Sequence, residues 1–386
     1  MDPIANPFSP GAGTPPPAFV GRDDLITSYQ IALRRTVSGR PGKSLMPIGL
    51  RGVGKTVLLN RFVEMSEDQE LVSAFIEAPE TGGFKRLLAA KLRSILITLD
   101  QGSVSHAVKR ALGALRSFTY NLPDGSSISL NVDALLGTAD SGVLAEDVTD
   151  LLVETGRAAQ DRGRGLLLAI DEVQYLTDEE LAALITAVHR TVQLRLPVIL
   201  VGAGLPQLPG LAGNAKSYAE RLFNFPEIGS LDTEDAREVL IAPAREERVE
   251  FADDALARLL EFTQGYPYFL QEWGYHVWNA APGSPITLDH VNSAADHVQT
   301  QLDENFFRVR MDRLTPAEKA YLGAMAELGA GPHRSGDIAG RLGVKVESVA
   351  PRRSGLIKKG MIYSPSHGDT AFTVPMFDDF LRRFSG

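Results

Sequence analysis

The stretch "PIGLRGVGKTVLLNRF", residues 47–62, decides the fold of the core. Its centre, residues 49–56, reads GLRGVGKT and fits the pattern G-x-x-x-x-G-K-[ST]. An apolar run at 44–50 precedes the loop, and apolar residues at helical spacing follow it over 55–65. Strand, glycine loop and helix is the order in which loop N–H groups and a helix N-terminus hold a phosphate. The stretch therefore predicts a nucleoside triphosphate site.

The residues of this loop have distinct expected roles. Lys55 would bring its ammonium to the β- and γ-phosphate oxygens as a point charge, and the Thr56 hydroxyl would bind Mg²⁺. The glycines let the backbone curl so that its N–H groups point at the β-phosphate. We therefore expect ATP or ADP with Mg²⁺ as cofactors, bound by Gly49, Arg51, Gly52, Val53, Gly54, Lys55, Thr56 and Val57.

A second signal is "RGLLLAIDEVQYL", residues 164–176, an apolar run that ends in Asp171 and Glu172. A carboxylate pair at the end of a buried strand is costly, because charged groups lose their hydration there. In combination with the loop, the pair predicts a Walker B site. Asp171 would hold Mg²⁺ through water, and Glu172 would polarise the attacking water. The alternative is a strand end whose acids are simply solvated.

A third strand is expected at 196–204, where many ATPases place a polar sensor at the tip. Here the tip reads Gly202-Ala203-Gly204. Either Gln207 substitutes for the sensor or phosphate sensing on this strand is weak; the plain alternative is a glycine turn into the next helix. A water-activating pair without the usual polar sensors predicts slow hydrolysis coupled to a conformational switch, not a fast motor.

Two further segments carry a family resemblance: "AFVGRDDLI" at 18–26 and "TQGYPYFLQEWGYHVW" at 263–278. With the two Walker motifs, they make the chain resemble the AAA+/STAND-type P-loop ATPases. It is similar within them to the archaeal ATPase group and to the origin-recognition and cell-division-cycle initiators. The resemblance implies that Phe19, Val20, Gly21 and Arg22 line the adenine and ribose. It also implies a G-x-P element, Gly265-Tyr266-Pro267, that touches the base or the phosphates.

The same resemblance implies an arginine finger within residues 215–231, with Arg221 as the candidate beside Lys55 and Glu172 as catalytic residues. Such an arginine reaches across a subunit boundary to stabilise charge on the transferring phosphoryl group. The alternative is an ordinary surface arginine. The lid segment 265–274 holds no arginine, which departs from the stricter AAA+ pattern and favours the switch-like STAND side.

The expected fold is α/β: a P-loop NTPase core with a parallel sheet, an α-helical lid and a C-terminal winged helix-turn-helix domain. A Pro/Gly-rich stretch at the start reads as an extended leader. Alternating residues around Pro123-Asp124-Gly125 predict a hairpin inserted near 118–132, and the role of the whole insertion over 100–143 is open. The expected boundaries are 1–17 for the leader, 18–231 for the core, 232–313 for the lid and 314–386 for the winged helix.

The C-terminal part reads as helix, helix, turn, helix and hairpin, with Ser348 expected to cap the third helix and Pro351 in its first turn. From Arg313 onward there are eleven Lys/Arg against seven Asp/Glu, although the whole chain carries −9. A basic recognition helix would meet double-stranded DNA in the major groove. The alternative is that the domain packs on the ATPase core or on a protein partner. The candidate DNA contacts are Arg352, Arg353, Lys358 and Lys359.

Composition sets the remaining limits. A chain of 386 residues suggests two or three domains, and the absence of cysteine excludes disulfides and thiolate chemistry. No apolar run reaches the length of a membrane span and the start does not resemble a secretory signal, so the cytoplasm is the expected location. The favoured hypothesis is a slow ATPase switch acting on or near DNA, with self-association. The rival hypothesis is a signalling or defence scaffold whose winged helix binds protein.

Overall fold

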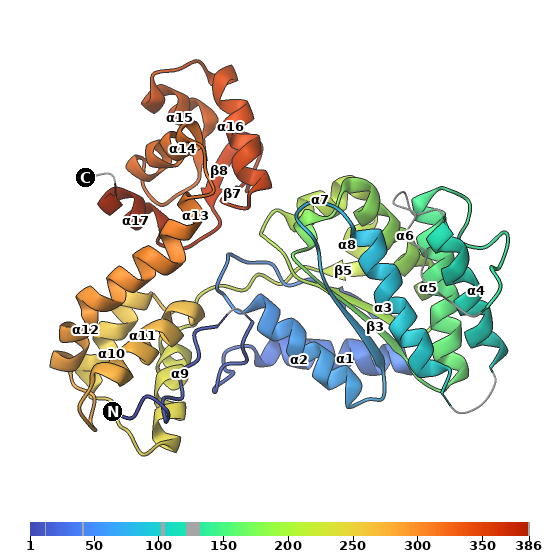
Figure 1. Ribbon diagram of the computed structural model, residues 1–386, viewed down its shortest axis with the longest axis horizontal. Coiled ribbons are helices and arrows are strands. Elements are labelled where there is room, and N and C mark those ends of the chain that lie inside the picture. The colour runs from blue at the N-terminus through green and yellow to red at the C-terminus, as the bar shows by residue number, and fades with distance from the viewer. Residues whose placement is uncertain (12, 41, 102–104, 121–131, 385–386) are drawn as a thin grey trace. The chain divides into compact units, whose positions relative to one another are not determined.

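The computed structural model describes residues 1–11, 13–40, 42–101, 105–120 and 132–384 (Figure 1). They form two compact units, each with its own hydrophobic core. We call them the sheet unit, Asp23–Ile48 with Leu58–Glu227, and the lid unit, Met1–Arg22 with Gly49–Val57 and Ile228–Gly386. The glycine loop of residues 49–56 thus belongs to the lid unit, although the helix that follows it continues into the sheet unit.

The sheet unit is built on parallel strands, as predicted. β2 (Val72–Glu77), β3 (Leu166–Asp171) and β4 (Val198–Gly202) pair side by side, and β1 (Ser44–Leu45) pairs with β5 (Phe223–Asn224). A parallel bridge from Ile48 to Gly204, with the Gly204 N–H donating to the Pro47 carbonyl at 3.1 Å, joins the two groups. The spatial order is therefore β2-β3-β4-β1-β5, so that β4 lies between the strand leading to the glycine loop and the strand ending in Asp171.

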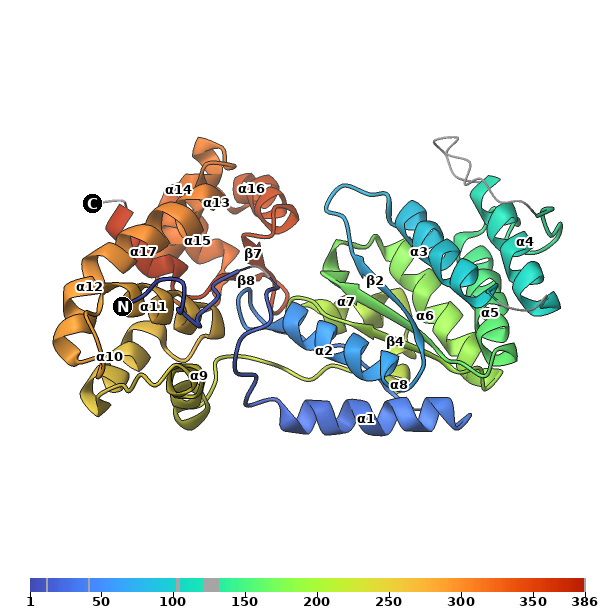
Figure 2. The ribbon, with the colours of Figure 1, turned by 60° about the horizontal axis from the view of Figure 1, so that its bottom comes forward.

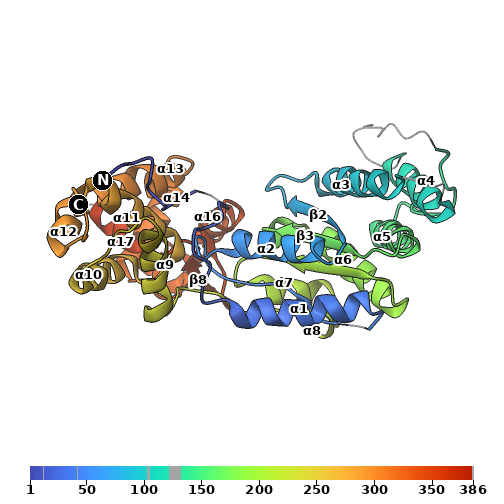
Figure 3. The same ribbon diagram turned by 90° about the horizontal axis from the view of Figure 1, so that it is seen from below.

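Helices pack along these strands, because every residue of β3 and β4 is buried and both faces need cover. Figures 1 and 3 show α3, α4, α5 and α6 following one another as a helical layer. The helices are α1 (Asp23–Val37), α2 (Lys55–Glu67), α3 (Phe84–Leu99), α4 (His106–Tyr120), α5 (Leu144–Asp161), α6 (Asp178–Gln193), α7 (Leu208–Ala215) and α8 (Ala219–Leu222). A short 3₁₀ turn, η1 (Val173–Tyr175), follows β3.

The hairpin predicted near 118–132 needs correction at its start. Residues 118–120 form the last turn of α4, because Phe118 continues the buried face of Ala111 and Leu115 at helical spacing. The remainder, 121–131, lies outside the described residues.

The lid unit is helical up to its C-terminal domain. α12 (Leu288–Gln301) runs into a π-helical segment, η2 (Leu302–Arg308), and then into α13 (Val309–Met311). One hydrophobic core includes residues of both the lid helices and the C-terminal domain. The other lid helices are α9 (Thr233–Glu246), α10 (Asp253–Thr263) and α11 (Pro267–Ala280).

The C-terminal domain has the element order predicted for a winged helix, with two additions: the strand β6 between its first two helices and the helix α17 after its last strand. The order is α14 (Pro316–Glu327), β6 (His333–Arg334), α15 (Ser335–Leu342), α16 (Val346–Lys358), β7 (Ile362–Tyr363), β8 (Asp369–Phe372) and α17 (Phe377–Phe384). The three strands pair antiparallel in the order β6-β8-β7.

The predicted start of α16 is wrong. The helix begins at Val346 after an N-cap at Lys345, so Ser348 lies in the first turn and Pro351 lies inside the helix. Val349 and Leu356 are fully buried on this helix, and their packing outweighs the lost backbone hydrogen bond at the proline.

The leader is irregular but well packed against α11 (Figure 2). Phe8 is 2% exposed and meets Phe251 and Trp278 edge to face, with centroids 6.5 and 6.4 Å away. The Trp278 Nε1–H donates to the Asp2 carbonyl at 3.0 Å, and the Ser9 N–H donates to Gln271 Oε1 at 3.1 Å. None of the described helices is long and apolar enough to cross a membrane.

Candidate nucleotide site and C-terminal interface

The glycine loop has the backbone that its sequence requires. Gly52 and Gly54 have φ of 84° and 90°, in the region that favours glycine. A Cβ at Gly49 would lie 2.2 Å from the Ile228 carbonyl, so only glycine allows this approach. Lys55 is 6% exposed, and its Nζ donates to the Gly49 and Leu50 carbonyls at 2.9 and 2.8 Å. The ammonium is therefore held inside the curl of the loop.

The "VGR" residues lie against this loop. The Arg22 guanidinium donates to the Gly229 carbonyl at 2.7 Å and to the Val53 carbonyl at 3.5 Å. Burial lowers the pKa of Arg22, and the nearby Asp235 carboxylate opposes that shift. Gly21, at φ 71°, leaves no room for a side chain, because a Cβ would lie 2.5 Å from Asp235 Oδ2. Val20 is partly buried against the core of the lid unit.

The lid helix and the C-terminal domain both reach the loop. α11 begins at Pro267, and the next residue, Tyr268, donates its N–H to the Gly52 carbonyl at 3.1 Å. The Arg51 N–H donates to the carbonyl of Thr373, just after β8, at 2.8 Å. The lid unit therefore brings together the predicted residues 20–22, the glycine loop and Pro267. It adds two residues that were not among the predicted site residues, Tyr268 and Thr373.

A second arginine stands beside Arg51. Burial, and then the neighbouring positive charge of Arg51, lower the pKa of Arg310 on α13 to about 10. The Arg310 guanidinium stacks over the Phe306 ring at 4.0 Å. This part of the loop is electropositive, which suits a bound anion.

The two acids predicted as a Walker B pair lie at the carboxyl end of β3, with Asp171 as its last residue. Asp171 is 3% exposed and accepts a hydrogen bond from the Glu172 N–H at 2.8 Å. Glu172 has φ 53° and ψ 40°, a left-handed conformation that is costly for a residue with a side chain. Such strain often occurs at functional positions, and the role of Glu172 stays a prediction.

The structure adds Gln174, which was not singled out in the same motif. Its Nε2 donates to Glu172 Oε2, and its Oε1 accepts from the Leu205 N–H at 3.0 Å. Gln207, which the sequence offered as a possible phosphate sensor, lies at the N-cap position of α7 and makes no side-chain cap hydrogen bond. Its Oε1 is buried without a hydrogen-bond partner in the described structure. The only available signal for Gln174 was its place two residues after the acid pair.

Two other predicted features can be located. Arg221 is exposed on the four-residue helix α8. Within the described ranges, no three His, Asp or Glu side chains cluster as metal ligands. The Asp171 carboxylate and the Thr56 hydroxyl are nonetheless hard oxygen donors of the kind Mg²⁺ accepts when phosphates supply further oxygens. The donor types therefore fit Mg²⁺ delivered with a nucleotide.

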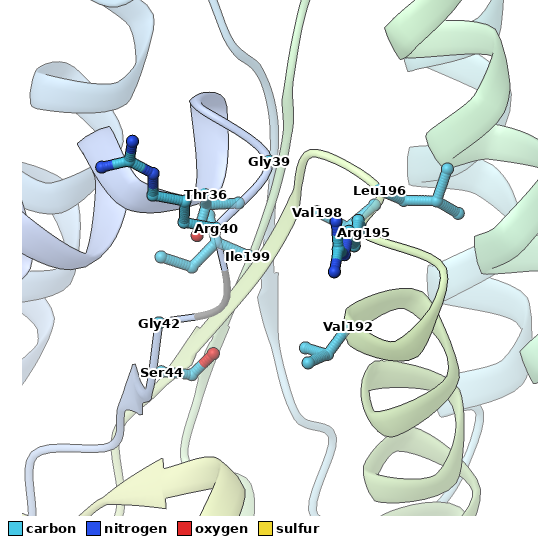
Figure 4. A pocket seen from close by; sticks show the side chains of 10 residues that line it. All are labelled: Thr36, Gly39, Arg40, Gly42, Ser44, Val192, Arg195, Leu196, Val198 and Ile199. Atoms are coloured by element: carbon cyan, nitrogen blue, oxygen red, sulfur yellow. The ribbon is translucent and has the colours of Figure 1, made fainter.

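A separate pocket lies at the amino ends of the strands, opposite to the end of β3 that carries Asp171 (Figure 4). It is lined by Ser44 and Val198, the first residues of β1 and β4, and by Arg40 and Arg195 from the ends of neighbouring helical segments. Ligands of open parallel sheets bind outside the carboxyl ends of the strands. This pocket is therefore not the candidate nucleotide site.

The four basic residues predicted as DNA contacts, at α16 and its C-cap, have different surroundings. Arg353 donates to Thr370 Oγ1, Ser364 Oγ and the Asp369 carbonyl at 3.0, 2.6 and 3.0 Å, so it ties α16 to the β7–β8 wing. Arg352 is half-buried and Lys358 is exposed.

The fourth basic residue, Lys359, is held by α14. Its Nζ donates to Glu318 Oε2 at 2.7 Å and to the Arg313 carbonyl at 3.1 Å. Burial alone would raise the pKa of Glu318, but hydrogen bonds from Lys359 and Thr315 outweigh it and hold the pKa below its ordinary value. Lys359 and Arg353 thus have intradomain roles, while Lys358 faces solvent.

Comparison with known families agrees with this geometry. Residues 18–201 match the model of the AAA ATPase domain, and residues 304–381 match a domain of unknown function. No curated relative matches the chain. The resemblance to AAA+ ATPases is therefore confirmed over 18–201.

Two of the solved structures that match the chain are the following. The Walker-type ATPase PABY2304 of Pyrococcus abyssi aligns with a TM-score of 0.57 at 15% identity, covering 94% of this chain and 96% of that chain. The Aeropyrum pernix Orc1 protein, solved in complex with DNA, aligns with a TM-score of 0.51 at 15% identity, covering 95% and 94%. At this identity the likeness establishes the P-loop NTPase fold.

Proposed function

We propose that this chain, an ATPase through the AAA ATPase domain of residues 18–201, is a nucleotide-dependent switch that acts on or near DNA through its C-terminal winged helix. The likeness to Orc1, which was solved bound to DNA, is in keeping with such a role. Hydrolysis is slow, with Glu172 as the base, Mg²⁺ on Thr56 and Asp171, and Arg221 supplied by a neighbouring copy of the chain.

One observation carries the switch: the glycine loop is hydrogen-bonded to both the lid and the C-terminal domain. Its Arg51 N–H bonds the Thr373 carbonyl at 2.8 Å, and its Gly52 carbonyl bonds the Tyr268 N–H at 3.1 Å. Phosphates in a P-loop compete for loop N–H groups and change which of them can bond elsewhere. Binding or loss of the nucleotide would therefore change a backbone hydrogen bond that joins the loop to the C-terminal domain.

The electrostatics at the loop favour the triphosphate. Burial is the main cause that lowers the pKa of Arg310, and the positive charge of Arg51 lowers it further, so an added anion would offset the repulsion between the two arginines. Lys55 has its ammonium inside the loop and exchanges carbonyl partners for phosphate oxygens. Lys55→Ala is expected to weaken ATP binding about 10-fold or more, because charge-assisted hydrogen bonds are lost.

The test of the DNA role is filter binding to duplex DNA at about 50 and about 200 mM salt, with ATP and with ADP. The proposal expects binding that differs between the nucleotides and falls steeply with salt. Absence of binding under all four conditions would overturn it. A mass measurement in solution, with ADP and with a non-hydrolysable ATP analogue, tests self-association through Arg221.

A second candidate function has its own observation in its favour. Arg353 and Lys359 form hydrogen bonds within the domain, so fewer basic side chains on α16 are available to a ligand than the sequence suggests. A signalling or defence scaffold whose winged helix binds protein fits that surface. It predicts ATP-dependent self-association without any DNA binding, so the two measurements above separate the candidates.

The hydrolysis step has a separate test. Glu172→Gln removes the carboxylate while keeping its shape, so it is expected to abolish turnover and to leave ATP binding intact. Undiminished turnover in this variant would remove Glu172 from the role of base.

A further inference from the structure

Gln174 joins the ends of two neighbouring strands through one side chain. It lies in the 3₁₀ turn η1, directly after β3, and is half-buried. Its amide bonds Glu172 Oε2 on one side and the Leu205 N–H, just beyond β4, on the other. The Val173 N–H also donates to the Ala203 carbonyl at 2.9 Å, so backbone and side chain tie the same two segments together.

The chemistry of this bridge requires glutamine. The Leu205 N–H can only donate, so the amide must present its oxygen there, and its NH₂ group is then directed at the Glu172 carboxylate. An ionised Glu at 174 would accept from Leu205 but could not donate to Glu172. A Met would fill the same space and make neither hydrogen bond.

Gly204, next to Leu205, leaves the space that the Gln174 side chain occupies. A Cβ at Gly204 would lie 2.8 Å from Gln174 Oε1, closer than real Cβ atoms approach. Gly204 is not among the described glycines with positive φ, so its need to be small is steric and arises at the amide and at Leu208, whose Cδ2 would lie 3.0 Å from the Cβ. The tip of β4, which holds no polar sensor of its own, is thus shaped to receive the side chain of Gln174.

We propose that Gln174 is the positioning residue for Glu172 and that it couples the carboxylate to the tip of β4. This inference rests on the proposed role of Glu172 as the base of ATP hydrolysis. Glu172 leaves β3 in a strained left-handed conformation, and the Gln174 amide fixes where the carboxylate then points. A movement at residues 203–205 is transmitted to the base through this amide, which supplies the link that a polar sensor on β4 would otherwise make.

The experiment compares Gln174→Ala, Gln174→Met and Gln174→Glu in the full chain. ATP turnover gives kcat and KM, a fluorescent ATP analogue gives affinity, and thermal melting reports the fold. Loss of a supporting hydrogen bond at a reacting group costs about 10- to 100-fold. All three variants are expected to lose about that factor in kcat, with KM, affinity and melting temperature close to wild type. Gly204→Ala is expected to lower kcat in the same way, because it displaces the amide.

Gln193→Ala is the matched control, because Gln193 is an exposed glutamine at the end of α6, away from both strand tips. Its kcat is expected to equal that of the wild type. Full kcat in Gln174→Met would mean that the side chain only fills space, and would overturn the proposal. If Glu172→Gln abolishes turnover while Gln174→Ala does not reduce it, only the positioning role fails. If turnover survives Glu172→Gln, the base assignment fails and the positioning role fails with it.

Discussion

The contact between the leader and the lid gives the sharpest quantitative prediction. Phe8 is 2% exposed, with its ring between Phe251 and Trp278 and directly over Gly274. Truncating a buried Phe to Ala removes about 3 kcal/mol of stabilisation, from lost burial and from the cavity left behind. Residues 1–11 form no helix or strand, so this loss falls on the docking of the segment rather than on the whole fold. At about 1.4 kcal/mol per factor of ten, Phe8→Ala should shift the docking equilibrium about 100-fold.

Hydrogen exchange measures this shift at a defined group. The Ser9 N–H donates to Gln271 Oε1 on α11, so its exchange requires the leader to leave the lid helix. The Ser9 amide is expected to exchange about 100-fold faster in Phe8→Ala. Ile4→Ala is the matched control, since it also removes an apolar side chain from the leader, but Ile4 is 94% exposed. Its exchange should match the wild type.

A variant on the lid side checks the same contact from the opposite direction. A Cβ at Gly274 would lie 2.7 Å from Phe8 Cδ1, so Gly274→Leu should expel the ring and reproduce the loss of protection at Ser9. Leucine favours helix more than glycine does, so weakening of α11 cannot explain such a result. Unchanged protection of the Ser9 amide in both Phe8→Ala and Gly274→Leu would refute the reasoning.

The remaining predictions concern the C-terminal domain. Arg352→Ala and Lys358→Ala should each reduce the slope of log affinity for duplex DNA against log salt by about 1, measured by filter binding. Arg353→Ala should instead lower the melting temperature of the domain, because three hydrogen bonds to the wing are lost. Glu318→Gln should destabilise the domain by about 1 kcal/mol at neutral pH, because the bond to Lys359 loses its charge. The folded-state pKa of Glu318 is depressed, so this stabilisation is present above the unfolded pKa of about 4.3 and is lost as pH falls through the folded pKa. Denaturant melts of Glu318→Gln and wild type should therefore converge in acid; a difference that persists there would contradict the charge-based explanation.

The sequence predicted the parts of this molecule whose signals are local. The glycine loop, the apolar run ending in Asp171 and Glu172, and the element order of the C-terminal domain each lie within a short window. β3 and β4 are buried along their whole length, which is why continuous apolar runs identified them.

The contacts that the sequence could not predict join distant segments. The bond from Arg51 to Thr373 and the bond from Gln174 to Leu205 depend on packing, and no local pattern marks either partner. The leader shows the same limit. Its prolines and glycines predicted extended backbone, but nothing in its composition indicated that Phe8 would enter the core of the lid unit.

The continuous core of the lid unit also affects how the protein can be divided. Phe307 in η2 lies 5.8 Å from the Phe377 ring and 5.1 Å from the Phe380 ring, both on α17. A cut near the predicted boundary at 313 would put Phe307 on one fragment and its two partners on the other. Each fragment would then display aromatic surface to water and tend to aggregate. Trimming the C-terminal region is consequently a poor way to isolate an ATPase, and single substitutions on α16 are the cleaner way to separate DNA contact from nucleotide turnover.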